Sequence, residues 1–515
     1  MKLASIFTDK MILQRDTPIR VFGTGNGVVT VRFLGEIVTG KGENGKWCVN
    51  LSPQPIGGPY SMEIDLDGKT ITLSDILIGD VFLACGQSNM SMPLFRTESG
   101  IDDSRHCDNE NIRYYTVPRR SKKGEDCYGL NFEGMYLEDK PWSICNEESS
   151  LHFSAIGHYF AQYVQRETNV PIGIISCNYG GRRIEAFIEK SYFYGVPALE
   201  NQMREFKNYV KDLDMVEYEK KYVDFTVKIK EFIDSKPNDY VDFIKKTDLY
   251  SAQYILNSGG KNPKAPVGPY DARSPGTLWE TMFSEIVPFG VRALLWYQGE
   301  SNGREMDYYE KYLVFLKCIR EQFGCEMDAY AIELAGYIEN AKEYIKNPGN
   351  YFATENDWAF LREQQQRATE IGKRNFLVTS QGLGDLYDIH PKRKKDLAVR
   401  LAKKVLRHTY GMDIVADQPI YHSVEFEDGK AYITLDNAEG LYGYTDGVNM
   451  YIAGDDHILH QATVEILPDN RLCVYSEDVK EPVLVRYGFC MYYFGTHLYN
   501  KGGLPLAPFR TDRDK

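Results

Sequence analysis

Continuous apolar runs alternate with helical periodicity through the middle of the chain. Residues 81–85 form an apolar run of the length and composition expected of a strand that is buried on both faces. Residues 291–297 and 376–380 repeat this pattern, and residues 153–167 between them have the apolar spacing of a helix. Buried strands alternating with helices predict an α/β layer built on a parallel sheet.

The pattern differs at both ends of the chain, where short alternating segments are separated by turn residues. Residues 60–66 alternate apolar and polar side chains, and Asp-Gly pairs recur at 67–68, 428–429 and 446–447. We therefore predict an N-terminal β accessory domain over residues 1–78, an α/β domain over 79–410 and a C-terminal β domain over 411–515. A Lys/Glu/Tyr-rich stretch at about 195–255 is predicted to be a helical insertion, either a lid or a solvated face.

Bulk composition narrows the function classes. The 515 residues carry a formal net charge of −13, which argues against nucleic acid or an anionic membrane as the main partner, because both require a basic surface. No apolar stretch reaches the about 18 residues of a membrane span. The ten Cys contain no Cys-x-x-Cys pair, so we expect no metal and no cofactor.

The first residues contain too few apolar side chains for a secretion signal, which favours a cytoplasmic location. In a secreted or periplasmic protein, Cys107, Cys127 and Cys145 would be near enough in sequence to pair. The sequence does not indicate the oligomeric state.

Polar side chains follow each of the three apolar runs directly. Ser88 comes after Gly86 and Gln87, Gln298 and Glu300 follow the second run, and a loop with Asp388 and His390 follows the third. Open α/β folds place their ligands at this edge of the sheet. A hydroxyl, amides and a carboxylate close to an imidazole supply the groups for acyl transfer by a serine nucleophile. The alternative for Ser88 is a helix N-cap.

Three blocks carry a specific resemblance: Gly-Gln-Ser-Asn-Met at 86–90, Trp-Tyr-Gln-Gly-Glu-Ser-Asn at 296–302 and Asp-Ile-His-Pro at 388–391. They resemble the signature blocks of the sialate O-acetylesterase family within the SGNH hydrolase superfamily, and the resemblance extends over nearly the whole chain. It implies an SGNH-type three-layer α/β/α domain with a parallel sheet, flanked by β-sandwich-like segments. It also implies a carbohydrate O-acetylesterase that uses a Ser-His-Asp acyl-enzyme mechanism.

Roles for individual residues follow from the chemistry and the resemblance. Ser88 is the predicted nucleophile and His390 the general base, because an imidazole titrates near neutral pH. The acid that orients His390 is Asp388 in the family pattern, with Asp385 as the alternative. The predicted hydrogen-bond donors to the oxyanion are the backbone N–H groups of Ser88 and of Gly180 or Gly181, and the side-chain amide of Gln298. Glu300 and Asn302 are predicted to support these loops. The alternative is that Asn302 itself is the donor.

The substrate is the least constrained inference. Arg182 and Arg183 follow the Gly180–Gly181 pair, and a bidentate arginine is the natural partner of a sialate carboxylate. The alternatives are an acetylated hemicellulose such as xylan, xyloglucan or mannan, a lipid or thioester substrate, and a non-catalytic glycan-binding protein.

Overall fold

A computed structural model describes residues 1–119, 140–234, 265–303, 305–338, 358–492 and 497–513. The predicted insertion at 195–255 and Cys127 therefore fall partly or wholly outside the described residues. The chain forms two compact units: Met1–Ser301 with Glu310–Ala329, and Asn302–Tyr309 with Tyr330–Lys515. Helix α10 (Tyr308–Phe323) and strand β13 (Asp328–Ile332) pass from one unit to the other.

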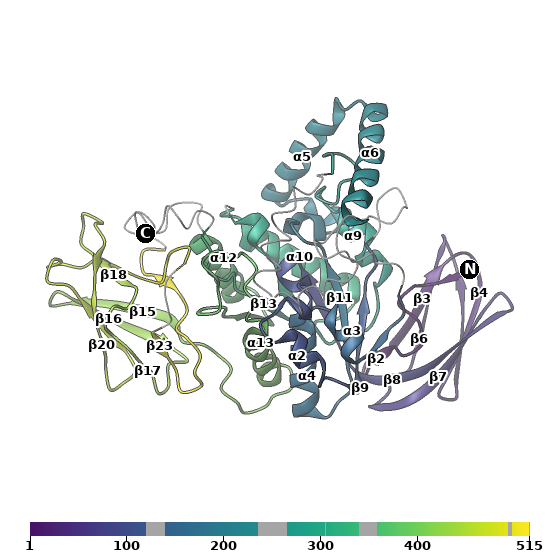
Figure 1. The fold of residues 1–515 in the computed structure, drawn as a ribbon, viewed down its shortest axis with the longest axis horizontal. Coiled ribbons are helices and arrows are strands. Elements are labelled where there is room, and N and C mark those ends of the chain that lie inside the picture. Colours follow the sequence, from purple (N-terminus) through teal and green to yellow (C-terminus); the bar gives the residue numbers. More distant parts are fainter. Residues whose placement is uncertain (120–139, 235–264, 304, 339–357, 493–496, 514–515) are drawn as a thin grey trace. The chain divides into compact units, whose positions relative to one another are not determined.

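Strand β8 (Lys69–Gly86) is the central element of the first unit. Its last residues lie between two parallel neighbours, β11 (Ile172–Asn178) and β12 (Ala293–Tyr297), and β9 (Asn109–Thr116) pairs with β11 on the far side. Figure 1 shows β8 continuing from these strands towards β7. The α/β fold that the apolar runs predict is therefore present, with these parallel strands forming part of a mixed sheet.

Burial changes along β8. Its first residues alternate between exposed and buried where they pair with β7 (Gly57–Leu66), and every residue from Ile76 to Gly86 is buried. The strand therefore continues without a break across the predicted domain boundary at 78–79.

The other strands of the first unit form mostly antiparallel arrangements. One three-stranded sheet has the order β1-β3-β6; β4, β5 and β7 continue from β8, β2 runs parallel to β8, and β10 pairs with β9. Their bounds are β1 Lys2–Leu3, β2 Ile12–Gln14, β3 Ile19–Thr24, β4 Gly27–Phe33, β5 Glu36–Gly42, β6 Lys46–Leu51 and β10 Ser143–Cys145.

Helix α4 (Ala155–Thr168) matches the predicted helix at 153–167 and has a residue-specific cap at each end. The Ser154 side chain accepts a hydrogen bond from the Gly157 backbone N–H, and Asn169 adopts the left-handed conformation after the last turn. Two longer helices lie within the predicted insertion, α5 (Pro197–Lys211) and α6 (Met215–Asp234). The other α-helices that begin in the described part of this unit are short: α1 Ser88–Ser91, α2 Gly100–Ser104, α3 Glu147–Leu151 and α9 Thr277–Thr281.

Gly86, the last residue of β8, lies where the chain turns towards Ser88. Its φ is +145°, and a Cβ there would lie 2.1 Å from the carbonyl oxygen of Tyr297. We expect Gly86→Ala to reduce stability by about 4 kcal/mol, because backbone strain and a steric clash each cost about 1–3 kcal/mol. Thermal unfolding followed by circular dichroism should show a melting midpoint lower by roughly 10 °C.

Gly35→Ala is the matched control for this variant. Gly35 has a φ of +82°, but a Cβ there would meet no atom within 4 Å. Only the backbone strain of about 1–2 kcal/mol should be lost in that variant. Equal losses in the two variants would contradict the role assigned to the close approach of Gly86 to Tyr297.

The second unit contains an α/β part and an antiparallel β part. Strand β14 (Asn375–Val378) packs with helices α12 (Trp358–Ile371) and α13 (Lys394–His408). Helix α13 is amphipathic: Leu397, Leu401 and Val405 recur every four residues and are all buried.

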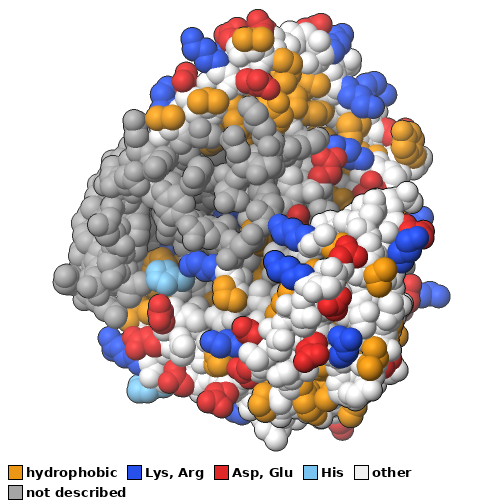
Figure 2. All heavy atoms as spheres, turned by 90° about the vertical axis from the view of Figure 1, so that its right-hand side faces the viewer, with side chains coloured by type: hydrophobic (Ala, Val, Ile, Leu, Met, Phe, Trp, Pro, Cys, Tyr) orange, Lys and Arg blue, Asp and Glu red, His pale blue; other side chains and the backbone are white. Residues whose placement is uncertain are grey.

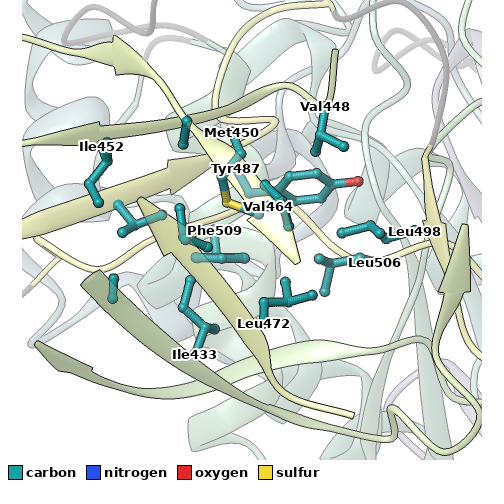
Figure 3. Packing of buried hydrophobic residues seen from close by; sticks show 14 of the residues in the cluster. Ile433, Val448, Met450, Ile452, Val464, Leu472, Tyr487, Leu498, Leu506 and Phe509 are labelled. Atoms are coloured by element: carbon teal, nitrogen blue, oxygen red, sulfur yellow. The ribbon is translucent and has the colours of Figure 1, made fainter. Parts of the chain in front are cut away.

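The C-terminal strands form two four-stranded antiparallel sheets with one shared core, and β17 pairs with β23 in a separate two-stranded sheet. Their orders are β15-β16-β21-β20 and β19-β18-β22-β24. Figure 3 shows Ile433 and Leu472 from the first sheet and Ile452 and Tyr487 from the second in this core. The bounds are β15 Ile420–Glu427, β16 Lys430–Asp436, β17 Tyr442–Gly443, β18 Met450–Ala453, β19 His460–Gln461, β20 Thr463–Ile466, β21 Leu472–Tyr475, β22 Leu484–Tyr487, β23 Leu498–Tyr499 and β24 Phe509–Arg510.

The surface of the first unit carries both signs of charge. On the face shown in Figure 2, lysine and arginine side chains are interspersed with aspartate and glutamate among the described residues. Within the described parts of the chain, no helix combines the length and apolar content needed to cross a membrane.

Candidate active site

Ser88 begins the short helix α1, two residues after β8 ends at Gly86. From residue 76 to residue 95 every residue is buried except Ser88, which is partly exposed. The N-cap of α1 is Gln87, and its side chain makes no capping hydrogen bond. The alternative of Ser88 as a helix N-cap therefore does not describe its position.

The loops on either side of Ser88 come from the two strands that flank β8. In the sheet register Gly86 lies beside Asn178 of β11 and beside Tyr297 of β12. The backbone N–H of Tyr179 donates to the carbonyl of Gly86 at 3.0 Å, and that of Gln87 donates to the carbonyl of Tyr297 at 3.1 Å. The first unit thus brings the Gly180–Gly181 turn and the Gln298 loop next to the strand end that carries Ser88.

Gln298 is completely buried, and its side chain is held by the neighbouring loop. Its Nε2 donates a hydrogen bond to the carbonyl oxygen of Arg182 at 3.1 Å. An amide carries two N–H groups, and this bond uses one of them. The predicted donor is therefore fixed to the loop that contains the two glycines.

Glu300 links the same loop to the residue after Ser88. The side-chain amide of Asn89 donates to Oε1 of Glu300, and the backbone N–H of Ser301 donates to Oε1 of Gln87 at 3.4 Å. The contact between Asn89 and Glu300 is consistent with the supporting role predicted for Glu300. Asn302 lies in the second unit, is buried, and donates to Oε2 of Glu305 at 2.8 Å.

The second unit brings Asp388 and His390 together. Oδ1 of Asp388 lies 3.7 Å from Nδ1 of His390 and accepts the His390 backbone N–H at 2.9 Å, while Oδ2 accepts from Nζ of Lys392 at 2.8 Å. Burial raises the pKa of Asp388, but the bonds from His390 and Lys392 outweigh burial and hold this pKa well below its usual range. Asp388 therefore remains a carboxylate at neutral pH.

Asp385 has a different position in the same loop. Its Oδ1 accepts the backbone N–H groups of Tyr387 at 2.9 Å and Asp388 at 3.0 Å. An aspartate that binds the backbone two and three residues later stabilises a turn. The described hydrogen bonds of Asp385 therefore go to the backbone of the loop that carries Asp388.

Sequence reasoning missed two residues that anchor this loop, the buried Glu333 and the half-buried Arg400. Oε2 of Glu333 accepts hydrogen bonds from Oγ1 of Thr379 and the N–H of Ser380, at 3.0 and 3.1 Å. Nη1 of Arg400 donates to the carbonyls of Thr379 and Gln381, at 3.1 and 2.9 Å. Glu333 directly follows the apolar strand β13, so the strand-end pattern that identified Ser88 could have found it. Arg400 has no comparable sequence signal.

The two predicted substrate arginines differ in their surroundings. Nη1 of Arg182 donates to the carbonyls of Gly180 at 3.1 Å and Gly181 at 3.2 Å. Arg183 is exposed, and its Nη1 lies 3.5 Å from Oε1 of Gln202.

Among the described residues, no group of three or more His, Cys, Asp or Glu side chains is arranged to hold a metal ion.

Comparisons with known proteins agree on one kind of enzyme. No family model matches the chain. The sialate O-acetylesterase of Rattus norvegicus is 22% identical over 448 residues, which cover 80% of this chain and 74% of that protein. The sialate O-acetylesterase of Homo sapiens is 27% identical over 206 residues, covering 36% of this chain and 38% of that protein.

A solved structure extends the similarity to the fold of the chain. The crystal structure of a carbohydrate acetylesterase from Xanthomonas citri is 25% identical, covers 99% of both chains and has a TM-score of 0.75. This similarity, with the α/β fold described above, defines the protein as an esterase. The chain is similar to sialate O-acetylesterases, the family that its three sequence blocks resemble.

Proposed function

We propose that this esterase removes acetyl groups from O-acetylated carbohydrates, with O-acetyl sialic acid as the leading substrate, through an acyl-enzyme on Ser88. One observation carries the proposal. Ser88 is the only partly exposed residue in a buried stretch of the chain, and it lies at a strand end flanked by the Gly180–Gly181 and Gln298 loops. The relatives named sialate O-acetylesterase and carbohydrate acetylesterase support the substrate class.

The proposed reaction has two halves. Oγ of Ser88 attacks the acetyl carbonyl while Nε2 of His390 takes the hydroxyl proton, and the protonated His390 then gives this proton to the departing sugar oxygen. Water deprotonated by His390 attacks the acetyl-Ser88 ester, and acetate leaves as Ser88 regains its proton. Asp388 lies near Nδ1 of His390, an arrangement that supports Nε2 as the reacting nitrogen.

Charge that develops on the acetyl oxygen requires hydrogen-bond donors. We assign this role to the backbone N–H of Ser88, the N–H groups of the Gly180–Gly181 turn and the amide of Gln298. Losing one such donor typically costs about 3–4 kcal/mol of transition-state stabilisation. The finer fold assignment belongs to the same proposal: an SGNH-type three-layer α/β/α domain, supported by parallel strands whose carboxyl ends carry the candidate residues.

A neutral acetylated glycan, such as acetylated xylan, is the second candidate substrate. A specific observation favours keeping it: the guanidinium of Arg182 already donates to two backbone carbonyls, which leaves fewer of its N–H groups to hold a sialate carboxylate. Sialate recognition needs a cation in this region, and xylan recognition does not.

The deciding experiment measures acetate release from O-acetyl sialic acid and from acetylated xylan side by side, with Ser88→Ala as the blank. We expect release from O-acetyl sialic acid at a rate at least about tenfold above that from xylan, because binding differences of about 1.4 kcal/mol suffice for that ratio. Release from xylan alone would transfer the proposal to plant glycans. Release from neither substrate, with the blank equal to the enzyme, would reject the proposed function.

A further inference from the structure

The turn between β11 and η2 (Ile184–Phe187) contains an arginine side chain that folds back onto the backbone of the two glycines before it. Arg182 donates from one nitrogen to the carbonyl oxygens of Gly180 and Gly181, and its guanidinium lies 4.3 Å from the centre of the Tyr179 ring. The guanidinium of Arg119 lies 5.1 Å from the same ring, and its Nε donates to the carbonyl of Asn178 at 2.9 Å. The Arg182 side chain is therefore held by three neighbouring groups of the turn.

These hydrogen bonds fix the direction of two peptide groups. In a trans peptide the C=O and the following N–H point in opposite directions. The carbonyl of Gly180 points at the guanidinium, so the N–H of Gly181 points away from it. The carbonyl of Gly181 does the same, so the N–H of Arg182 also points away. Gly181 has a φ of +65°, a conformation that glycine adopts without strain.

The backbone of Arg182 is tied to the other candidate donor. Its carbonyl oxygen accepts the hydrogen bond from the fully buried amide of Gln298. One residue thus contacts the glycine carbonyls through its side chain and the Gln298 amide through its main chain. The turn adjoins the strand end of Ser88, because Tyr179 donates to the carbonyl of Gly86.

We propose that Arg182 is a positioning residue that orients the Gly180–Gly181 turn, so that the Gly181 N–H is the glycine donor to the oxyanion. This inference rests on the proposed function of Ser88 and adds to it. In this role Arg182 helps to stabilise the transition state for every acetyl ester, whether or not the substrate carries a charge. The rival role is a clamp for the carboxylate of sialate, which would matter only for acidic substrates.

An uncharged substrate separates the two roles. With p-nitrophenyl acetate, we expect Arg182→Ala to lower kcat by about 30-fold with KM changed less than about twofold, since a displaced donor is lost mainly from the transition state. Millimolar guanidinium chloride should restore part of this kcat by refilling the space between the carbonyls and Tyr179. The melting midpoint is measured for each variant under the same conditions.

Arg166→Ala is the matched control, because Arg166 also lies over a tyrosine ring, 4.6 Å from the centre of Tyr163, on helix α4 away from the candidate site. It should keep the kcat of the unmodified enzyme. An unchanged kcat for Arg182→Ala on p-nitrophenyl acetate, with a raised KM on O-acetyl sialic acid, would overturn the inference in favour of a clamp. A loss of kcat with a fallen melting midpoint and no rescue by guanidinium would also overturn it.

The proposed function is tested separately in the same series. If the unmodified enzyme fails to hydrolyse p-nitrophenyl acetate, or if Ser88→Ala keeps its activity, the acyl-enzyme proposal itself fails. If Ser88→Ala is inactive and Arg182→Ala is not impaired, only the positioning role of Arg182 fails.

Discussion

Ser88→Ala is expected to lower kcat for p-nitrophenyl acetate by about 10⁶-fold, the size of loss that follows removal of a serine nucleophile in a triad. The alanine methyl cannot form the acetyl ester, and the loops of Gly181 and Gln298 can assist only a direct attack by water. Stability should change little, because Ser88 is partly exposed and does not serve as the N-cap of α1. A melting midpoint within a few degrees of the unmodified enzyme would show that the loss is chemical.

Labelling with a fluorophosphonate gives an independent readout of the same prediction. The unmodified enzyme should be labelled at Ser88, and Ser88→Ala should not be labelled. Ser104→Ala is the control, because Ser104 also lies in a short helix and donates its hydroxyl to a carbonyl, that of Ile101, at 2.8 Å. Labelling of Ser88→Ala at another serine, with turnover retained, would contradict the assignment.

The strand that carries Ser88 was predictable because burial on both faces leaves a continuous apolar run. Residues 81–85 lie within β8, as predicted, but β8 starts much earlier, at Lys69. Its first half alternates in polarity because one face is exposed, so the sequence suggests two elements where there is one. Burial of a strand leaves a sequence signal, whereas continuity of a strand through a change of environment leaves none.

The candidate residues of the first unit were predictable for a related reason. Ser88, the Gly180–Gly181 pair and Gln298 each follow a buried parallel strand, and parallel strands place their carboxyl ends at one edge of the sheet. The similarity to sialate O-acetylesterases and the esterase class were also predicted, and the comparisons confirm both. The individual roles of these residues stay predictions.

The function of an arginine side chain was not predictable from its position in the sequence. Arg182 follows two glycines, which suggested a side chain extended towards substrate. Its described contacts are instead with the carbonyls of Gly180 and of Gly181, which has a left-handed conformation, and with the Tyr179 ring, near which Arg119 also lies. Contacts that depend on backbone dihedral angles and on a distant residue leave no local pattern.

The loop after β14 poses the same difficulty, since Asp385 and Asp388 are both close to His390 in sequence. Only the fold separates them: Asp385 accepts two backbone N–H groups of the loop, and Asp388 faces His390 and Lys392. Lys392, four residues after Asp388, is almost completely buried and contributes to the low pKa of that carboxyl. Lys392 lies beside the pair formed by Asp388 and His390. This arrangement supports Asp388 as the acid that orients His390.

Asp388→Asn is accordingly expected to lower kcat for p-nitrophenyl acetate by about 10⁴-fold, as loss of the triad acid does when it leaves the histidine in the wrong tautomer. Asp385→Asn should lower kcat by less than about tenfold, because the asparagine oxygen can still accept the N–H groups of Tyr387 and Asp388. The two variants change the same atom types in one loop, so each is the control for the other. A larger loss in Asp385→Asn would reverse the assignment of the acid.

The pH dependence provides the second test of this assignment. Because the folded-state pKa of Asp388 is lowered, its ionised form and its stabilising contribution are fully present above the unfolded value of about 3.9 and are lost as pH falls towards the folded pKa. Protonation of Asp388 should therefore not set the acid limb of kcat/KM measured with p-nitrophenyl acetate. An acid limb near pH 4 in the unmodified enzyme would mean that a carboxylate with an ordinary pKa limits turnover. Asp388, whose pKa is lowered, would not be that carboxylate.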